Sequence, residues 1–143
     1  MAIKVGINGF GRIGRMVLRS IIENNRKDIE VVAINNRGNS EVSSFLLQHD
    51  SIHGKLKAKI SHSDKTITIS GKKISLIRET EISKINWKKY KVDVVLECTG
   101  KFNTKEKSAQ HIKSGAKKVL VSAPCKGAIN VIFGVNHKTL KNS

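Results

Sequence analysis

The stretch IKVGINGFGRIG, residues 3–14, carries the pattern that decides the fold. A short β-branched run opens it, and apolar residues continue at helical spacing as far as Ile21, so a strand, a turn and a helix are predicted. In the G-x-G-x-x-G turn, Gly9 permits a tight bend, Gly11 lets the backbone approach a pyrophosphate, and Gly14 lets the helix pack closely on the strand. Glycines that only connect a strand tightly to a helix would give the same pattern. The predicted strand before the turn and the predicted helix after it nevertheless favour dinucleotide binding.

Strands and helices alternate along the rest of the chain. The predicted buried strands are rich in β-branched residues and span 3–7, 29–34, 92–97, 118–122 and 130–134. One helix between them presents Val42 and Phe45 on one side, and another begins near Thr104 with Ile112 on its inner face. Shorter alternating runs between 55 and 77 predict antiparallel strands. This order indicates an α/β protein with a Rossmann-type, doubly wound, mostly parallel sheet that carries a short antiparallel insertion.

The end of the second strand bears on the choice of cofactor. A dinucleotide fingerprint normally has an acidic residue there, which holds the adenosine ribose. Here the strand ends Ile34-Asn35-Asn36-Arg37, without a carboxylate. Asn36 can donate to ribose or phosphate without repelling a 2′-phosphate, and Arg37 adds a cation. The residues therefore leave both NAD and NADP open as the cofactor, and a plain loop role for Asn36 is open too.

Two later strand ends supply further candidates for the cofactor site. Thr99 and Gly100 follow the run 92–97, and Ser122 ends the next predicted strand. Serine and threonine often end strands because their hydroxyls support turns. In open α/β sheets, however, ligands lie outside the carboxyl ends of the strands, so we expect these residues at the cofactor cleft.

The charge balance is strongly basic, with 27 Lys and Arg against 11 Asp and Glu and a net charge of +16. Such a balance can indicate a nucleic-acid or anionic membrane partner. However, only 6 of the cations are arginines, and scattered lysines are typical of a solvated face. One Trp, one Tyr and four Phe make a poor stacking platform for single-stranded nucleic acid. No apolar run approaches the roughly 20 residues that span a bilayer. We therefore expect neither a nucleic-acid nor a membrane partner.

Cysteines and histidines suggest no further site. Cys98 and Cys125 form no disulfide framework, so a reducing cytoplasm is the expected compartment. His49, Asp50 and His53 fall within five residues, but no cysteine or further acidic ligand completes a set. We expect no metal site.

A more specific pattern runs through the whole chain. It consists of segments in a fixed order and spacing: KVGINGFGRIGR (4–15), VAIN (32–35), HDSIHG (49–54), ECTGKF (97–102), GAKKV (115–119) and SAP (122–124). Together these segments resemble the NAD(P)-binding domain of phosphorylating glyceraldehyde-3-phosphate dehydrogenase.

The resemblance implies roles for individual residues. Cofactor contacts are implied for the turn and for the later strand ends, at Asn8, Gly9, Phe10, Gly11, Arg12, Ile13, Thr99, Gly100 and Ser122. Among these, Arg12 and Ile13 would lie on the pyrophosphate. Asn36 stands where the family has its ribose-binding aspartate, so the NAD or NADP preference stays open. The family's adenine-side arginine aligns with Thr80, and Arg78, two residues earlier, is the candidate to replace it.

The resemblance further implies an enzyme of glycolysis or gluconeogenesis that oxidises a small phosphorylated aldehyde to an acyl phosphate, as a cytoplasmic homotetramer. The family's nucleophilic cysteine lies in an S-x-x-S-C-T-T-N segment beyond the stretch that ends at Asn136, and the chain ends at Ser143 without that segment. We therefore expect residues 1–143 to be the NAD(P)-binding domain, with no catalytic residue of its own, with the catalytic domain absent, and inactive alone.

Two alternatives stay open. Erythrose-4-phosphate dehydrogenase shares the fold and the opening motifs. A non-catalytic module that binds a dinucleotide or a nucleic acid through the same cleft would also fit the basic composition.

Overall fold

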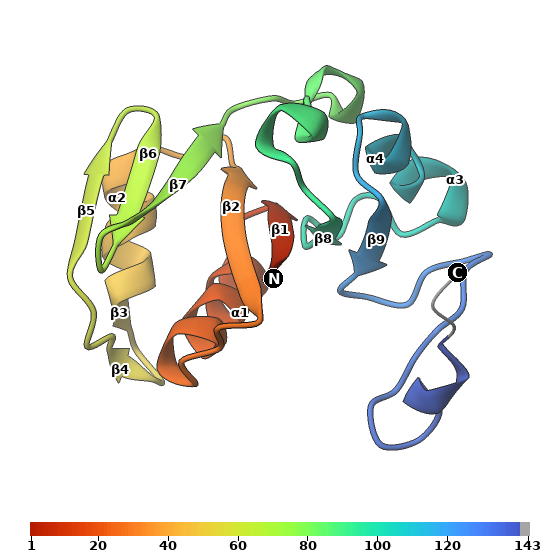
Figure 1. The fold of residues 1–143 in the computed structure, drawn as a ribbon, viewed down its shortest axis with the longest axis horizontal. Helices are drawn as coiled ribbons and strands as arrows, with labels where there is room; N and C mark the ends of the chain where they lie inside the picture. Colours follow the sequence, from red (N-terminus) through yellow and green to blue (C-terminus); the bar gives the residue numbers. More distant parts are fainter. Residues whose placement is uncertain (141–143) are drawn as a thin grey trace.

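The computed structural model describes residues 1–140, and a seven-stranded sheet forms its centre (Figure 1). The strands of this sheet are β1 Ile3–Asn8, β2 Ile29–Asn35, β5 Ile60–Ser63, β6 Thr66–Ile69, β7 Lys72–Ile77, β8 Val94–Glu97 and β9 Lys118–Val121. Their order is β5-β6-β7-β2-β1-β8-β9. Neighbours from β7 to β9 are parallel, whereas β6 pairs antiparallel with both β5 and β7. The predicted α/β sheet, mostly parallel with a short antiparallel insertion, is confirmed.

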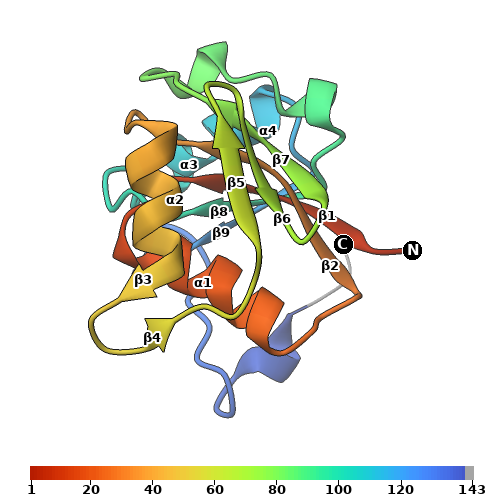
Figure 2. The ribbon, with the colours of Figure 1, turned by 90° about the vertical axis from the view of Figure 1, so that its left-hand side faces the viewer.

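Helices cover this sheet, and a small separate pair of strands, β3 His49–Asp50 and β4 Gly54–Lys55, lies beside it. The helices are α1 Arg12–Glu23, α2 Ser40–Gln48, α3 Lys105–Ser108 and α4 Gln110–Lys113, with 3-10 turns η1 Ile82–Lys84, η2 Trp87–Tyr90 and η3 His137–Thr139. Helix α2 packs against α1 and against β5 and β6 (Figures 1 and 2). Helix α4 contacts η1 and β9 near the other edge of the sheet.

Two apolar clusters fill the two sides of the sheet. The first joins alternate residues of β1 and β2, such as Val5 and Val31, to Leu18 of α1 and Leu47 of α2. The second gathers around Trp87 and includes Ala33, Val95 and Ala116. Successive strand residues point to opposite faces, so a strand buried on both faces is apolar throughout.

In the second cluster, the ring of Trp87 packs directly against β1 at Gly6. Trp87 is fully buried, and a Cβ atom on Gly6 would lie 2.6 Å from its ring. The indole Nε1 donates a hydrogen bond to His111 Nδ1 over 3.0 Å. The absence of a side chain at Gly6 therefore lets a large aromatic ring lie directly on the strand that leads into the glycine turn.

The expectation that Ile112 lies on an inner helix face is wrong, and the apolar residues that share one side of α2 face outward as well. Val42 and Phe45 are 53% and 61% exposed, because α2 turns small serines and Leu47 toward the sheet instead. Ile112 is also exposed, since α4 turns His111 inward to hydrogen-bonding partners in the interior. In both cases the apolar residues lie on the face opposite the core.

The predicted strand at 130–134 is also wrong, because these residues form loop and turn. The side chain of Asn136 takes the backbone groups that a strand partner would need. Its Oδ1 accepts from the backbone N–H of Ile132 at 2.7 Å, and its Nδ2 donates to the carbonyl of Asn130 at 3.0 Å. Such local side-chain bonds compete with strand pairing.

Within residues 1–140, no helix combines the length and the apolar character that crossing a membrane requires.

Replacing Trp87 with phenylalanine tests the second cluster. We expect the free energy of unfolding to fall by about 2 kcal/mol, because a cavity forms and His111 Nδ1 loses its donor. Urea unfolding followed by circular dichroism measures the change. Phe133→Leu, at an aromatic residue that is 89% exposed, serves as the control and should shift the value by less than about 0.5 kcal/mol. Equal stability of the Trp87 variant and the wild type would contradict this account.

Candidate functional site

The site lies where the order of the sheet reverses direction. After β1 the chain adds β2 and β7 on one side, and it then crosses to add β8 and β9 on the other. The carboxyl ends of β1 and β8 are therefore neighbours whose following loops diverge. In open parallel sheets such a switch point leaves a crevice that binds ligands.

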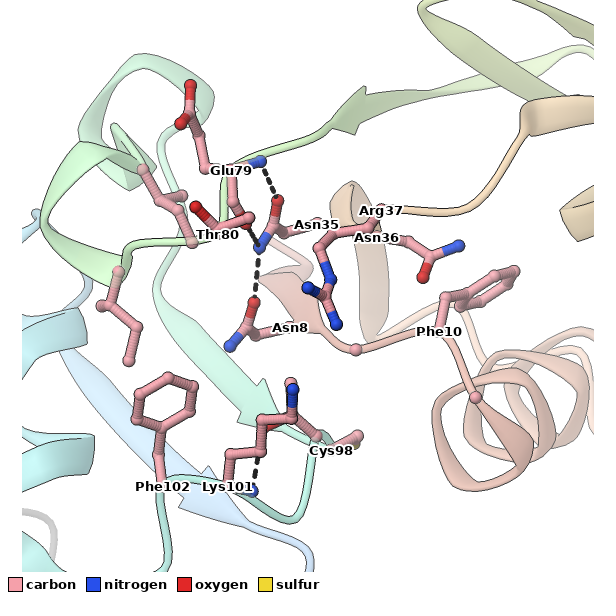
Figure 3. A pocket seen from close by; sticks show the side chains of 15 residues that line it. Asn8, Phe10, Asn35, Asn36, Arg37, Glu79, Thr80, Cys98, Lys101 and Phe102 are labelled. Atoms are coloured by element: carbon pink, nitrogen blue, oxygen red, sulfur yellow. Dashed lines mark hydrogen bonds between the residues drawn. The ribbon is translucent and has the colours of Figure 1, made fainter.

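A cleft of about 270 Å³ opens at this point (Figure 3). It is lined by the ends of β1, β2 and β8 and by the segment after β7: Asn8, Gly9, Phe10, Gly11, Asn35, Asn36, Arg37, Glu79, Thr80, Ile82, Ile85, Cys98, Thr99, Lys101 and Phe102. Polar groups and apolar side chains share this lining. The cleft thus combines the two kinds of surface that a dinucleotide presents.

Each of the three glycines of the turn lies in a different steric environment. Gly9 has φ +93°, and a Cβ there would lie 2.8 Å from Thr99, so the turn and β8 can approach closely. A Cβ on Gly14 would lie 2.2 Å from the carbonyl oxygen of Gly9, so α1 packs directly on the turn. By contrast, a Cβ on Gly11 would meet nothing within 4 Å and would occupy open space in the cleft.

The amino end of α1 faces this open space without a side-chain cap, because Gly11 occupies the N-cap position. The first backbone N–H groups of a helix have no partner within the helix, and the helix dipole favours an anion there. A pyrophosphate fits this combination of free donors and unfilled volume.

A buried chain of amides ties the strands of the cleft together. Asn35 Nδ2 donates to Asn8 Oδ1 at 2.7 Å and to the carbonyl of Glu79 at 2.9 Å (Figure 3). Its Oδ1 accepts from the backbone N–H of Glu79 at 2.9 Å. Asn35 therefore holds the segment after β7 against the ends of β1 and β2. Sequence reasoning included Asn8 but missed Asn35 as a functional residue.

Glu97 is the charged centre beneath the cleft, and it is fully buried. Its Oε2 accepts from Asn8 Nδ2 at 2.6 Å and from His111 Nε2 at 2.8 Å, while Oε1 accepts from the backbone N–H and the hydroxyl of Thr99. Burial raises the pKa of Glu97, but these hydrogen bonds, led by that from His111, outweigh it and hold the pKa below its ordinary value. The ionised carboxylate thus fixes Asn8 and Thr99 at the mouth of the cleft.

The protonation of His111 follows from its two neighbours. Its Nδ1 accepts from the indole N–H of Trp87, so that nitrogen carries no proton. The ring proton lies on Nε2 and is donated to Glu97. A neutral histidine therefore joins the second apolar cluster to the carboxylate. Sequence reasoning had not included His111 in the site, because no motif links it to Glu97 at the end of β8.

The structure brings most of the predicted cofactor residues together. The cleft lining includes the predicted residues Asn8, Gly9, Phe10, Gly11, Asn36, Arg37 and Thr99. Gly100, with φ +73°, makes the next bend of the chain. Ser122 follows β9 one strand further out, where its backbone N–H donates to the carbonyl of Glu97. Their roles toward a cofactor remain predictions.

The side chain of Arg12 is engaged elsewhere. Its guanidinium pairs with Asp50 through contacts of 2.6 and 3.3 Å, and neither Arg12 nor Ile13 lines the cleft. The pKa of Asp50 is lowered to about 2 by the backbone N–H groups of His53 and Ile52 and by Arg12. Arg12 and Ile13 can meet a pyrophosphate through their backbone N–H groups at the start of α1.

Arg78 does not line the cleft, and Thr80 does. The role of Arg78 toward the adenine stays a prediction, and its exposed side chain lies at a neighbouring hollow that Arg37 and Asp64 also line. There its Nη2 donates to the backbone carbonyl of Asp64 at 3.1 Å. Arg37 is the arginine whose side chain lies at the cleft (Figure 3).

The two cysteines lie in different surroundings. Cys98 is half-buried in the wall of the cleft, and burial raises the pKa of its thiol, so the nucleophilic thiolate is disfavoured. Cys125 is buried in the loop after β9, where its backbone bonds to the side chain of Asn130. Sequence reasoning had not included Cys98, Lys101 or Phe102 in the site.

Replacing Glu97 with glutamine tests the buried centre. We expect a loss of about 3 kcal/mol in the free energy of unfolding at pH 7, because the amide presents a donor where four donors converge. The exposed Glu106→Gln is the matched control and should change little. A Glu97 variant as stable as the control would contradict the proposed centre.

The loss should depend on pH with a defined sign. A glutamate whose folded pKa is lowered contributes its full stability above the ordinary glutamate pKa, about 4.3, and loses it as the pH falls through the lower folded pKa. Urea unfolding at pH 7, 5, 4 and 3 should therefore show the gap between wild type and Glu97→Gln closing only below about pH 4.3. A gap that is the same at pH 7 and pH 3 would argue against an ionised Glu97.

Comparison with known proteins places these features in one family. Residues 3–105 match the family model described as "Glyceraldehyde 3-phosphate dehydrogenase, NAD binding domain". The chain is 50% identical over 141 residues to a glyceraldehyde-3-phosphate dehydrogenase of Cereibacter sphaeroides, with 98% of this chain and 42% of the relative covered. It is 47% identical to that of Xanthobacter flavus (99% and 43% covered) and 45% identical to that of Thermotoga maritima (96% and 42% covered). The chain thus spans less than half the length of these relatives.

Proposed function

Because the chain belongs to the glyceraldehyde 3-phosphate dehydrogenase family, as its NAD-binding domain, we propose that the cleft at the carboxyl ends of β1, β2 and β8 holds the dinucleotide. The observation that carries this proposal is the open space at Gly11, where a side chain would meet no protein atom. This space faces the uncapped amino end of α1. Backbone donors beside an unfilled volume are what a pyrophosphate requires.

We propose that the remaining residues of the cleft contact the two ends of the cofactor. On the β2 side, Asn36, Arg37 and Thr80 are available to the adenosine. On the β8 side, Thr99 and Phe102 are available to the nicotinamide, and Ser122 and Gly100 lie on the loops that follow the adjacent strands. In this arrangement Glu97 holds Thr99 by two hydrogen bonds, so the nicotinamide side rests on a fixed hydroxyl.

The family and its relatives support an NAD-dependent dehydrogenase as the complete enzyme. We propose that it oxidises a small phosphorylated aldehyde to an acyl phosphate in the cytoplasm, as a homotetramer, and that residues 1–143 are its NAD(P)-binding domain. A bound NAD or NADP supplies the hydride acceptor for this reaction. This chain's own residues bind the cofactor, orient it and contribute to the choice between NAD and NADP.

The chemical step needs a thiolate that this cleft does not supply. Cys98 is held in its protonated form by burial, and Cys125 is buried outside the cleft. Acyl transfer to phosphate requires a covalent thioester, which a protonated, half-buried thiol forms poorly. We therefore propose that the nucleophile belongs to a different segment of the complete enzyme.

Gly11→Val tests cofactor binding separately from folding. We expect the free energy of unfolding to stay within about 0.5 kcal/mol of wild type, since the new side chain meets open space. Affinity for NADH should fall at least about tenfold, because the side chain occupies the volume that the pyrophosphate needs. Fluorescence titration with NADH measures the affinity.

Ala128→Val, on an exposed loop after β9, is the control for adding a β-branched side chain. It should bind NADH like the wild type. Undiminished binding by a folded Gly11→Val variant would place the dinucleotide elsewhere.

The 143-residue chain should not oxidise glyceraldehyde 3-phosphate in the presence of phosphate and either NAD or NADP. Absorbance at 340 nm follows the formation of the reduced cofactor. Turnover that disappears in a Cys98→Ser variant would show that Cys98 acts as the nucleophile and would overturn this part of the proposal.

A further inference from the structure

We infer that the cofactor site of this chain is built for a 2′-phosphate, so that NADP is bound in preference to NAD. The site for that phosphate is a hollow of about 300 Å³ beside the cleft, lined by Arg37, Gly38, Asn39, Ser40, Asp64 and Arg78. This inference rests on the proposed function, because it takes the adenosine to lie at the end of β2.

The first support is the absence of a carboxylate at the end of β2. A carboxylate in that place accepts from the ribose 2′-hydroxyl and repels a 2′-phosphate. Asn36 stands there, and its Nδ2 donates to the hydroxyl of Ser43 at 3.1 Å. The neutral amide is thereby held against Ser43 of α2 at the edge of the cleft. Asn36 therefore presents neither a negative charge nor a bulky group that would exclude a phosphate.

The second support is the position of Arg37, which lines both the cleft and the hollow. Its side chain is exposed, and within residues 1–140 no carboxylate pairs with it. A guanidinium can stack on an aromatic ring through its face and bind a phosphate through its edge. Arg37 is therefore placed to cover the adenine while its N–H groups reach a phosphate on the adjoining ribose.

The third support is Arg78, which reaches the hollow from the end of β7. The carbonyl of Asp64 accepts from one of its terminal nitrogens at 3.1 Å, which leaves other N–H donors available. The lining contains one carboxylate, that of Asp64, so the two arginines leave a net positive charge. Two guanidiniums converging on one hollow suit a dianionic phosphate better than a neutral hydroxyl.

Five of the six arginines of this chain form two groups, and the sixth, Arg15, donates to the backbone carbonyl of Phe10. Within the described residues, Arg12, Arg19 and Arg26 each pair with a carboxylate. Arg37 and Arg78, far apart in sequence, instead flank the same hollow. The position of Thr80 in the cleft wall adds no cation there. The segment after β7 therefore places no positive charge in the cleft wall. The positive charges of Arg37 and Arg78 lie instead where a 2′-phosphate would bind.

Titration of the 143-residue chain with NADPH and NADH, followed by nicotinamide fluorescence, tests the inference. We expect NADPH to bind at least about tenfold more tightly, because charge-assisted hydrogen bonds contribute on that scale. Arg37→Gln and Arg78→Gln should each weaken NADPH about tenfold and NADH less than about twofold. Asn36→Asp should weaken NADPH selectively. Arg26→Gln, an exposed arginine at the opposite end of β2, removes the same charge and should leave the ratio unchanged.

Competition by adenosine 2′,5′-bisphosphate and by inorganic phosphate shows whether the hollow binds the 2′-phosphate of a nucleotide or the free phosphate anion. The nucleotide should displace NADPH at concentrations where inorganic phosphate does not. Displacement by inorganic phosphate alone would show a site for the free anion and overturn the inference.

The outcomes also separate this inference from the proposed function. If neither NADPH nor NADH binds, the proposed function fails and the inference fails with it. If NADH binds at least as tightly as NADPH, or if Arg37→Gln and Arg78→Gln weaken both cofactors equally, the cleft is a dinucleotide site but the hollow is not a 2′-phosphate site.

Discussion

The carboxylate of Glu97 is the group on which the arrangement of the site depends. It is fully removed from water, yet it stays charged because four donors from three parts of the chain converge on it. These donors come from Asn8 at the end of β1, from Thr99 after β8, and from His111 in α4. A buried charge with only part of this shell would be costly. The folded structure must therefore bring all three parts together, and in doing so it sets the floor of the cleft.

Close packing around the glycine turn adds a second constraint of a different kind. The turn lies against β8 at Gly9 and against α1 at Gly14, with no room for a side chain at either position. Gly6 lies in the same way against Trp87. Through His111 the indole is linked to Glu97, so the steric and the electrostatic constraints meet in one network. Gly11 alone among these glycines faces open space. Its proposed role is therefore in binding, whereas the role of Gly6, Gly9 and Gly14 is in packing.

The lysines and the arginines that make up the high positive charge are distributed differently in the structure. Lysines are spread over the surface, and the described ion pairs of lysine, with Glu81 and with Asp93, are exposed ones that contribute little to stability. Arginines, with their fixed fork of donors, occupy defined positions instead. Three of them close ion pairs, and Arg37 and Arg78 flank the hollow next to the adenosine end. The net charge of +16 therefore says less about the partner than the placement of two arginines does.

Local sequence was sufficient for the strand, turn and helix of residues 3–23, for the mostly parallel α/β sheet, and for the family. The reason is that glycine spacing and hydrophobic periodicity are properties of neighbouring residues. Other features depended on contacts between distant residues. The hydrogen bond of His111 to Glu97, the pairing of Arg12 with Asp50 and the shared hollow of Arg37 and Arg78 each involve segments more than 10 residues apart. Periodicity cannot predict such contacts, because the neighbours of a polar or charged side chain are set by the packing of the sheet and not by the residues on either side of it in the chain.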